Sequence, residues 1–362
     1  MDFTPTETQA AVRGVVRDVL DRDPASWKAL ASAGLLAVPV PAALGGEGLG
    51  LGEVAVMLHE VAARAEPLPV WETLCCGVLT LAAHGTPAQQ ARLLPEVASG
   101  AVLLGPALVE PGGALSDGAA STLTSQGGRL VLSGRKTCVT HASDSARLLV
   151  PVAVTGVDSV GRAVVLLDPH APGVTVTPTR ASRGEVEATV VLADVEVAED
   201  DVLGGWEAAE AGEATLRRLA VAGLCLLGDG LVAGARDLTA RYVSGREQFG
   251  RVLAEFQAVS QQMADVYVAA RTIGLAATSA AWRLAEGLDA DDDLAVAAYW
   301  FTREGPAALH VCHHLHGGTG VDITYPLHRY YAWGKDVARV LGGAHQTLDA
   351  VAARLVDATG GL

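Results

Sequence analysis

The stretches Ser244-Gly-Arg-Glu-Gln-Phe-Gly250 and His314-Leu-His-Gly-Gly-Thr-Gly320 interrupt a region that otherwise has a helical pattern. The first stretch ends a long helical segment at an Arg, and the second places glycines beside histidines. Neither follows the regular spacing of apolar residues that packs a helix into a core. Around these two breaks, the sequence from residue 206 onwards predicts a bundle of helices.

The sequence upstream of this bundle changes its pattern near residue 101. Residues 1–102 have the periodicity of amphipathic helices, whereas residues 103–205 alternate short β-branched runs with Gly, Ser, Asp and Pro turns. We therefore predict an α+β chain with an N-terminal helical domain (1–102), a middle antiparallel β domain (103–205) and a C-terminal four-helix bundle (206–362). The candidate strands are 129–133, 146–154, 163–167, 173–177 and 188–192.

Composition and charge narrow the class of protein. The 362 residues are 50% hydrophobic and 19% charged, which is enough apolar material for a large core. A net charge of −15 argues against a nucleic-acid partner and against adhesion to an anionic membrane. The five cysteines have no metal-site spacing, so we expect no metal. No signal peptide is apparent, and no apolar stretch is expected to reach the roughly 18 residues that span a bilayer, so a cytoplasmic location is expected.

The two opening stretches have chemical as well as structural interpretations. Glycines at 317, 318 and 320 allow close backbone approach and expose N–H groups to a phosphate, although such a cluster is more often only a turn. It is neither a Walker loop nor a dinucleotide fingerprint, because no Gly-Lys-Ser/Thr follows it and no strand precedes it. The guanidinium of Arg246 suits a pyrophosphate, but an Arg at a helix end also commonly caps carbonyls.

Taken together, the order of domains and motifs resembles that of the acyl-CoA dehydrogenase family over essentially the whole chain. The motifs that carry the resemblance in the C-terminal half are Arg246-Glu-Gln-Phe-Gly250, Phe256-Gln-Ala258, Met263-Ala-Asp265, His316-Gly-Gly-Thr-Gly320 and Tyr325-Pro-Leu-His-Arg329. Those in the middle are Val109-Glu-Pro-Gly112, Ser116-Asp117, Gly134-Arg-Lys136 and Cys138-Val-Thr140.

The resemblance implies a non-covalent FAD bound at an interface between subunits. Arg246 would reach the pyrophosphate of a neighbouring subunit's FAD, and Thr140 would face the isoalloxazine ring. Ser116 would lie near the acyl-CoA thioester or its pantetheine arm, and Glu110 would shape the turn beneath the flavin. The other residues that the resemblance assigns to FAD are Gln248, Phe249, His314, Gly317, Gly318 and Gln346.

The implied reaction is dehydrogenation of the Cα–Cβ bond of an acyl-CoA, or of an acyl-carrier thioester. A carboxylate would remove the α-proton while a β-hydride passes to flavin N5. The reduced flavin would then pass its electrons to an electron-transfer flavoprotein. The resemblance also implies a homo- or heterotetramer. An oxidase of the same fold that uses O₂ is a further alternative.

The usual catalytic Glu is absent. One family position for it falls on Leu341 or Gly342, and the alternative position, in a Leu-Glu-Arg-Leu context, is Arg217. A guanidinium is no base at neutral pH. His345 is a weak replacement candidate. Asp229 is an acid that lies about 18 Å along the helix from Arg217, too far to substitute directly, and is more simply explained as facing solvent or capping a turn.

Three more departures concern the flavin. Val109 stands where a Thr usually meets it, Cys138 replaces a Trp, and His314 replaces a Gln. The chain is closer to a shorter branch of the family whose members often form α2β2 tetramers, in which one subunit can lack the base. Two hypotheses therefore stand: an FAD-dependent dehydrogenase, or a non-catalytic subunit that completes the flavin site of a partner.

Overall fold

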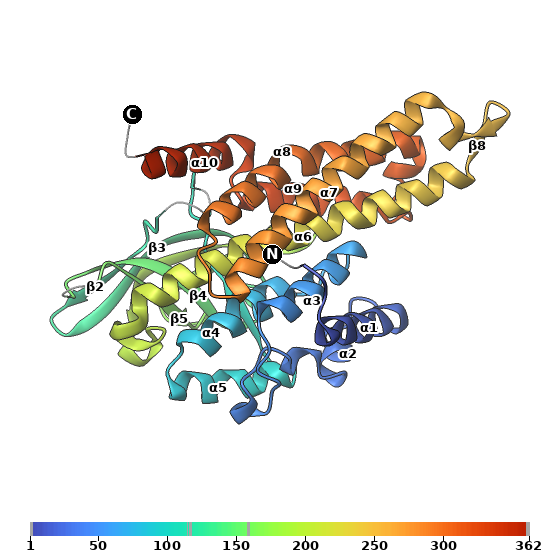
Figure 1. Ribbon diagram of the computed structural model, residues 1–362. Helices are drawn as coiled ribbons and strands as arrows, with labels where there is room; N and C mark the ends of the chain where they lie inside the picture. Colours follow the sequence, from blue (N-terminus) through green and yellow to red (C-terminus); the bar gives the residue numbers. More distant parts are fainter. Residues whose placement is uncertain (1–2, 114, 116–117, 158–159, 360–362) are drawn as a thin grey trace. The chain divides into compact units, whose positions relative to one another are not determined.

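A computed structural model of the chain describes residues 3–113, 115, 118–157 and 160–359 (Figure 1). The chain divides into two compact units, each described here by itself. One unit combines Pro5–Met57 with Leu68–Gly223, and the other combines Met1–Thr4, Leu58–Pro67 and Leu224–Leu362. The boundaries of the three domains expected from the sequence, after residues 102 and 205, stay a prediction.

Helices occupy the first hundred residues, as predicted. Thr6 and Thr86 begin α1 and α5 as reciprocal capping boxes, with Gln9 and Gln89 respectively, because each Thr hydroxyl accepts from a free N–H of the first turn. The helices are α1 (Glu7–Arg22), α2 (Trp27–Ser32), η1 (Leu35–Ala37), η2 (Ala42–Leu44), α3 (Leu51–Ala63), η3 (Val70–Val78), α4 (Leu79–His84) and α5 (Pro87–Ala98). Of these, η3 is a nine-residue π-helix, a rare conformation.

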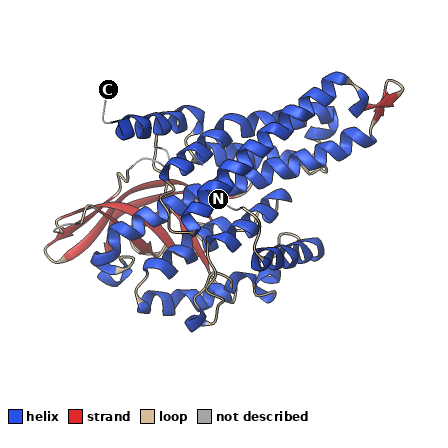
Figure 2. Ribbon diagram, viewed as in Figure 1, coloured by secondary structure: helices blue, strands red, loops and turns tan. Residues whose placement is uncertain are grey.

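The middle region forms a seven-stranded sheet in the order β1-β4-β2-β3-β7-β6, with β5 paired to β4. Most pairs are antiparallel, as expected, but β4 pairs in parallel with both β1 and β2. The strands are β1 (Leu103–Pro106), β2 (Thr122–Gln126), β3 (Arg129–Thr140), β4 (Ser145–Thr155), β5 (Arg162–Leu167), β6 (Val174–Arg180) and β7 (Val186–Val197). Figure 2 shows that all the strands except a short hairpin belong to this sheet.

The sheet has its own apolar core. Leu132, Val150, Val165 and Val190 are each fully buried in it, and the sequence alternation of β3 and β7 directs one residue in two toward this core. Trp206 packs against the same cluster from the start of α6 (Gly205–Gly245), after the short η4 (Glu199–Asp201). The start of α6 is thereby fixed to the sheet.

The helix α6 corrects one expectation from the sequence. It contains an 18-residue segment with a mean hydropathy of 1.5, so it is long and apolar enough to cross a membrane, although no such stretch was predicted. However, 72% of this 18-residue segment is buried within the protein. Its apolar character is therefore accounted for by packing in the protein interior.

The second unit is helical beyond α6. The elements are the hairpin β8 (Glu247–Gln248) and β9 (Arg251–Val252), η5 (Leu253–Glu255), α7 (Gln257–Ala285), α8 (Asp291–His316), η6 (Gly317–Val321), α9 (Leu327–Val340) and α10 (Gly343–Thr359). α8 packs against α7, α9 and α10, and Phe301 at its centre is fully buried. The predicted bundle is thus present, with α10 as an added helix.

Candidate functional site

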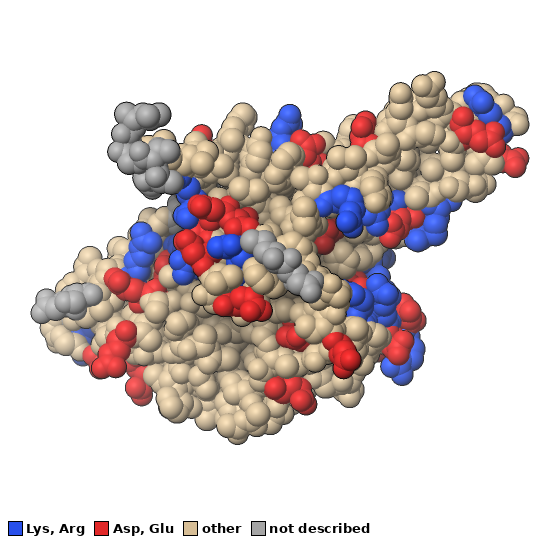
Figure 3. All heavy atoms as spheres, viewed as in Figure 1, with Lys and Arg blue, Asp and Glu red and all other residues tan. Residues whose placement is uncertain are grey.

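The predicted residues Arg246, Gln248 and Phe249 lie together on the hairpin that follows α6. All three are exposed, and Phe249 is 90% exposed with a left-handed φ of 54°. Arg251 stacks its guanidinium 3.9 Å from the ring centre of Phe256, which stiffens the base of the hairpin. Figure 3 shows basic and acidic side chains together near this end of the unit. The ring of Phe249 lies edge-on to that of Phe256, with centroids 6.2 Å apart, so two aromatic side chains are neighbours at the hairpin.

The glycine cluster forms η6, directly after α8. His314, Gly317 and Gly318 are exposed, and the N–H of Gly317 caps α8 by donating to the carbonyl of His314. Such a backbone accepts close approach by a phosphate or an adenine edge. The structure thus leaves these predicted FAD contacts accessible within this unit.

Tyr242 connects the glycine turn to the end of α6. Its ring stacks on His316 with centroids 4.2 Å apart, and its hydroxyl lies 3.4 Å from Thr319 Oγ1. Arg246 N–H in turn donates to the carbonyl of Tyr242. Arg246 and the glycine turn are therefore brought to the same end of the unit, as the resemblance implies.

His316 supports this arrangement rather than offering a reactive group. It is 3% exposed, its Nδ1 lies 2.8 Å from the carbonyl oxygen of Cys312, and the hydroxyl of Tyr325 lies 3.0 Å from its Nε2. Burial lowers the pKa of His316, so a neutral ring, which donates from Nδ1 and accepts at Nε2, is favoured at neutral pH. Gln346, also predicted to meet FAD, is exposed on α10, and no hydrogen bond or ring contact in the described residues joins it to this site.

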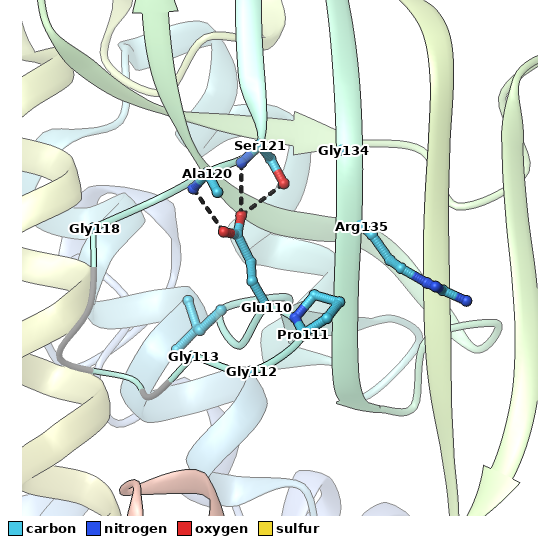
Figure 4. Close-up of a pocket in the computed structure, with 10 residues that line it drawn as sticks. Glu110, Pro111, Gly112, Gly113, Gly118, Ala120, Ser121, Gly134 and Arg135 are labelled. Atoms are coloured by element: carbon cyan, nitrogen blue, oxygen red, sulfur yellow. Dashed lines mark hydrogen bonds between the residues drawn. The ribbon is translucent and has the colours of Figure 1, made fainter. Parts of the chain in front are cut away.

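The other unit contains a hollow of about 380 Å³ beside the Glu110 turn (Figure 4). Glu110 accepts hydrogen bonds from Ala120 N–H at 2.6 Å and Ser121 N–H at 2.8 Å. Lys136 Nζ donates to the same carboxylate at 2.6 Å, although its side chain is fully buried. Gly134 is required here, because a Cβ would lie 2.2 Å from Ser121 Oγ.

These bonds decide the charge of Glu110. Burial alone would raise its pKa, but the hydrogen bonds from Lys136 and Ser121 prevail and lower the pKa to about 2. Glu110 is therefore ionised and fully engaged, which makes it an anchor for the turn and excludes it as the missing base. Ser116, predicted to contact the thioester, lies outside the described residues.

Thr140, predicted to face the flavin ring, has a partner that the sequence did not indicate. Its hydroxyl donates to Glu72 Oε1 at 2.8 Å, and Glu72 is 6% exposed on η3. Two residues earlier in β3, Cys138 has a left-handed φ of 58°, at a point where the β3–β7 register shifts. The only sequence signal for Glu72 was an acidic residue within an apolar helical run.

The two positions to which the resemblance assigns the base have other contacts in the structure. Arg217 Nε donates to Glu213, which is 2% exposed, and Arg217 Nη1 donates to the carbonyl of Leu115 at 2.8 Å. Leu341 is 3% exposed, and Gly342 has a φ of 99° in the turn between α9 and α10. Neither position offers a proton acceptor.

The two replacement candidates behave differently. His345 is exposed on the first turn of α10. Asp229 neither faces solvent freely nor caps a turn: its carboxylate lies 3.0 Å from His59 Nδ1 and packs against Gly274 on α7. That interpretation of Asp229 was therefore wrong. Its role is to pair with His59 inside the helical unit.

Comparison with known proteins assigns the chain to a family. Residues 3–101 match the acyl-CoA dehydrogenase N-terminal domain, and residues 204–356 match the C-terminal domain. The chain is 46% identical to acyl-CoA dehydrogenase FadE28 of Mycobacterium tuberculosis, over 98% of this chain and 99% of that protein. The chain belongs to the acyl-CoA dehydrogenase family. It is thus an oxidoreductase of the acyl-CoA dehydrogenase type, from a family whose members typically carry FAD.

Two solved structures are similar over nearly the whole chain. A variant of the Tcur3481–Tcur3483 steroid ACAD has a TM-score of 0.89 and 33% identity, with 98% of this chain and 99% of that chain covered. The ChsE4–ChsE5 complex from Mycobacterium tuberculosis has a TM-score of 0.89 and 30% identity, with 99% of each chain covered. These matches confirm the three-part α+β fold of the acyl-CoA dehydrogenases.

Proposed function

We propose that this chain is a subunit of a heteromeric acyl-CoA dehydrogenase and that a partner subunit supplies the catalytic carboxylate. The observation that carries the proposal is Arg217. Where other members place the Glu, this guanidinium is tied to Glu213 and to the Leu115 carbonyl. A buried ion pair of this kind cannot remove a proton from a substrate.

The chain's contribution to a flavin would come from the hairpin and the glycine turn. Arg246 offers a fork of donors to a pyrophosphate, and Gly317 and Gly318 offer exposed backbone. These residues fit FAD, which when bound supplies the redox chemistry. We assign their role to the FAD of the partner subunit, which would sit at the interface.

The substrate that we propose is an acyl-CoA with a bulky, steroid-like acyl group. Support comes from the names of the similar complexes, one of which is a steroid ACAD. An electron-transfer flavoprotein is the proposed electron acceptor, and the cytoplasm is the proposed location. The tetramer that we expect contains two different chains.

The test starts from the visible spectrum of the chain purified alone and after co-expression with a family member that carries the Glu. Each sample is then titrated anaerobically with steroid acyl-CoAs and with short straight-chain acyl-CoAs. We expect the chain alone to show no bleaching of flavin absorbance, and the mixed complex to bleach. Bleaching by the chain alone would overturn the proposal, and His345→Ala would then test the remaining candidate base.

A further inference from the structure

Glu72 is a buried acid that the proposed function leaves without a role. Glu72 is 6% exposed. Among the described residues its carboxylate accepts one hydrogen bond, from the Thr140 hydroxyl. By contrast, Glu110 has Lys136 and Glu213 has Arg217 as cationic partners. A buried carboxylate without a cation is costly, so its retention calls for an explanation.

The position of Glu72 is fixed from both sides. Trp71 Nε1 donates to the carbonyl of Ala220 on α6, and Thr73 Oγ1 donates to the carbonyl of Leu104 on β1. Between them, the π-helical turn of η3 places Glu72 against β3. The backbone that carries Glu72 is therefore anchored on both sides, and the Glu72 carboxylate lies at Thr140.

A threonine hydroxyl has a single proton to donate. While that proton is bonded to Glu72, it is not available to an acceptor nitrogen or oxygen of a flavin ring. Val109 and Cys138 stand where the resemblance implies a Thr and a Trp, so the flavin contacts that it assigns to those two side chains are changed as well.

We propose that Glu72 prevents this chain from binding an FAD of its own, because it accepts the hydrogen bond that the Thr140 hydroxyl would otherwise donate to the flavin ring. The chain would then contact FAD only through the Arg246 hairpin and the glycine turn. The inference rests on the proposed function, because it assumes that the flavin of the complex belongs to the partner. It predicts one flavin for each pair of unlike chains. The role of Glu72 would then be to prevent this chain from binding an FAD that the fold otherwise accommodates.

The experiment is a titration of the purified chain with free FAD, followed by quenching of flavin fluorescence. Wild type is compared with Glu72→Ala, Thr140→Val and the double variant, and exposed Glu207→Ala serves as the matched control. We expect Glu72→Ala to bind FAD roughly tenfold more tightly or better, because the Thr140 hydroxyl is released. The double variant should return to the wild-type affinity, and Thr140→Val alone should change nothing.

Glu72→Gln gives a second, nearly isosteric variant if the Ala variant does not fold, and it too should gain affinity. Affinity within twofold of wild type in every folded Glu72 variant would overturn the inference. So would a wild-type chain that binds FAD tightly and loses it with Thr140→Val, since Thr140 would then serve the flavin. The proposed function fails on a different result, namely reduction of flavin by acyl-CoA in the chain alone.

Discussion

The ammonium of Lys136 lies 2.6 Å from the carboxylate of Glu110, and no part of the Lys136 side chain reaches solvent. Burial lowers the pKa of Lys136, and the hydrogen bond that it donates to Glu110 opposes this shift. Together the two residues hold β3 to the turn that follows β1. Removal of either partner leaves a buried charge unpaired.

We therefore expect Lys136→Met to lower the free energy of unfolding by about 3–5 kcal/mol. Urea denaturation at neutral pH, followed by far-UV circular dichroism, measures this. Lys28→Met is the matched control, because Lys28 is exposed, and it should stay within about 0.5 kcal/mol of wild type. Equal midpoints for the two variants would show that the buried pair is not stabilising.

The low pKa of Glu110 predicts a specific acid sensitivity. Its folded-state pKa of about 2 lies below the ordinary value of 4.5. The stabilisation is therefore fully present above pH 4.5 and is lost as the pH falls from 4.5 towards 2. Glu110→Gln should be less stable than wild type at neutral pH but should show a shallower loss over that window. Parallel pH profiles would contradict the assignment.

The glycine turn provides a prediction that separates stability from flavin binding. His316→Ala loses the stack on Tyr242 and two hydrogen bonds, so we expect a stability loss of about 2 kcal/mol. His314→Ala removes only an exposed side chain and should leave the melting temperature unchanged. In the mixed complex, both variants should retain less FAD. Flavin retention equal to wild type in His314→Ala would remove His314 from the site.

Restoration of a Glu at position 217 should not restore catalysis. Arg217→Glu places a second acid beside Glu213, which is buried and would lose its cation. We expect a loss of about 3–5 kcal/mol in stability and no flavin reduction by the chain alone. Arg217→Met should lose a similar amount, whereas Lys28→Met, at an exposed position of the same unit, should lose little. A stable, active Arg217→Glu variant would refute this account.

Much of the fold was predictable from local patterns. The helices of the first hundred residues and five of the seven strands of the main sheet follow from apolar periodicity. β1 and β2 were not predicted, because each has only four or five residues and is fixed by pairing with other strands, β1 with β4 and β2 with β3 and β4. The π-helical conformation of η3 was also hidden, since its apolar pattern is that of an ordinary helix.

Some residues of the candidate site were also predictable from local sequence patterns, and others were not. Arg246 and the glycine turn were predicted as FAD contacts because they break the helical pattern, and their contact with FAD stays a prediction; the link between them through Tyr242 was not predicted. The Thr140–Glu72 bond joins residues that are 68 positions apart, and no local signal marks it. Contacts of this kind depend on how η3 and β3 pack, which periodicity alone does not specify.

The turn at Gly342 has a consequence for the ancestry of this chain. Its φ of 99° strains any residue with a side chain, while Leu341 before it is buried. Arg217 is paired with the buried Glu213. A single codon change at any of these positions would damage folding before it returned a proton acceptor. If the chain works in the proposed heteromeric complex, its dependence on a partner would therefore be hard to reverse by single substitutions, because each one would first cost stability.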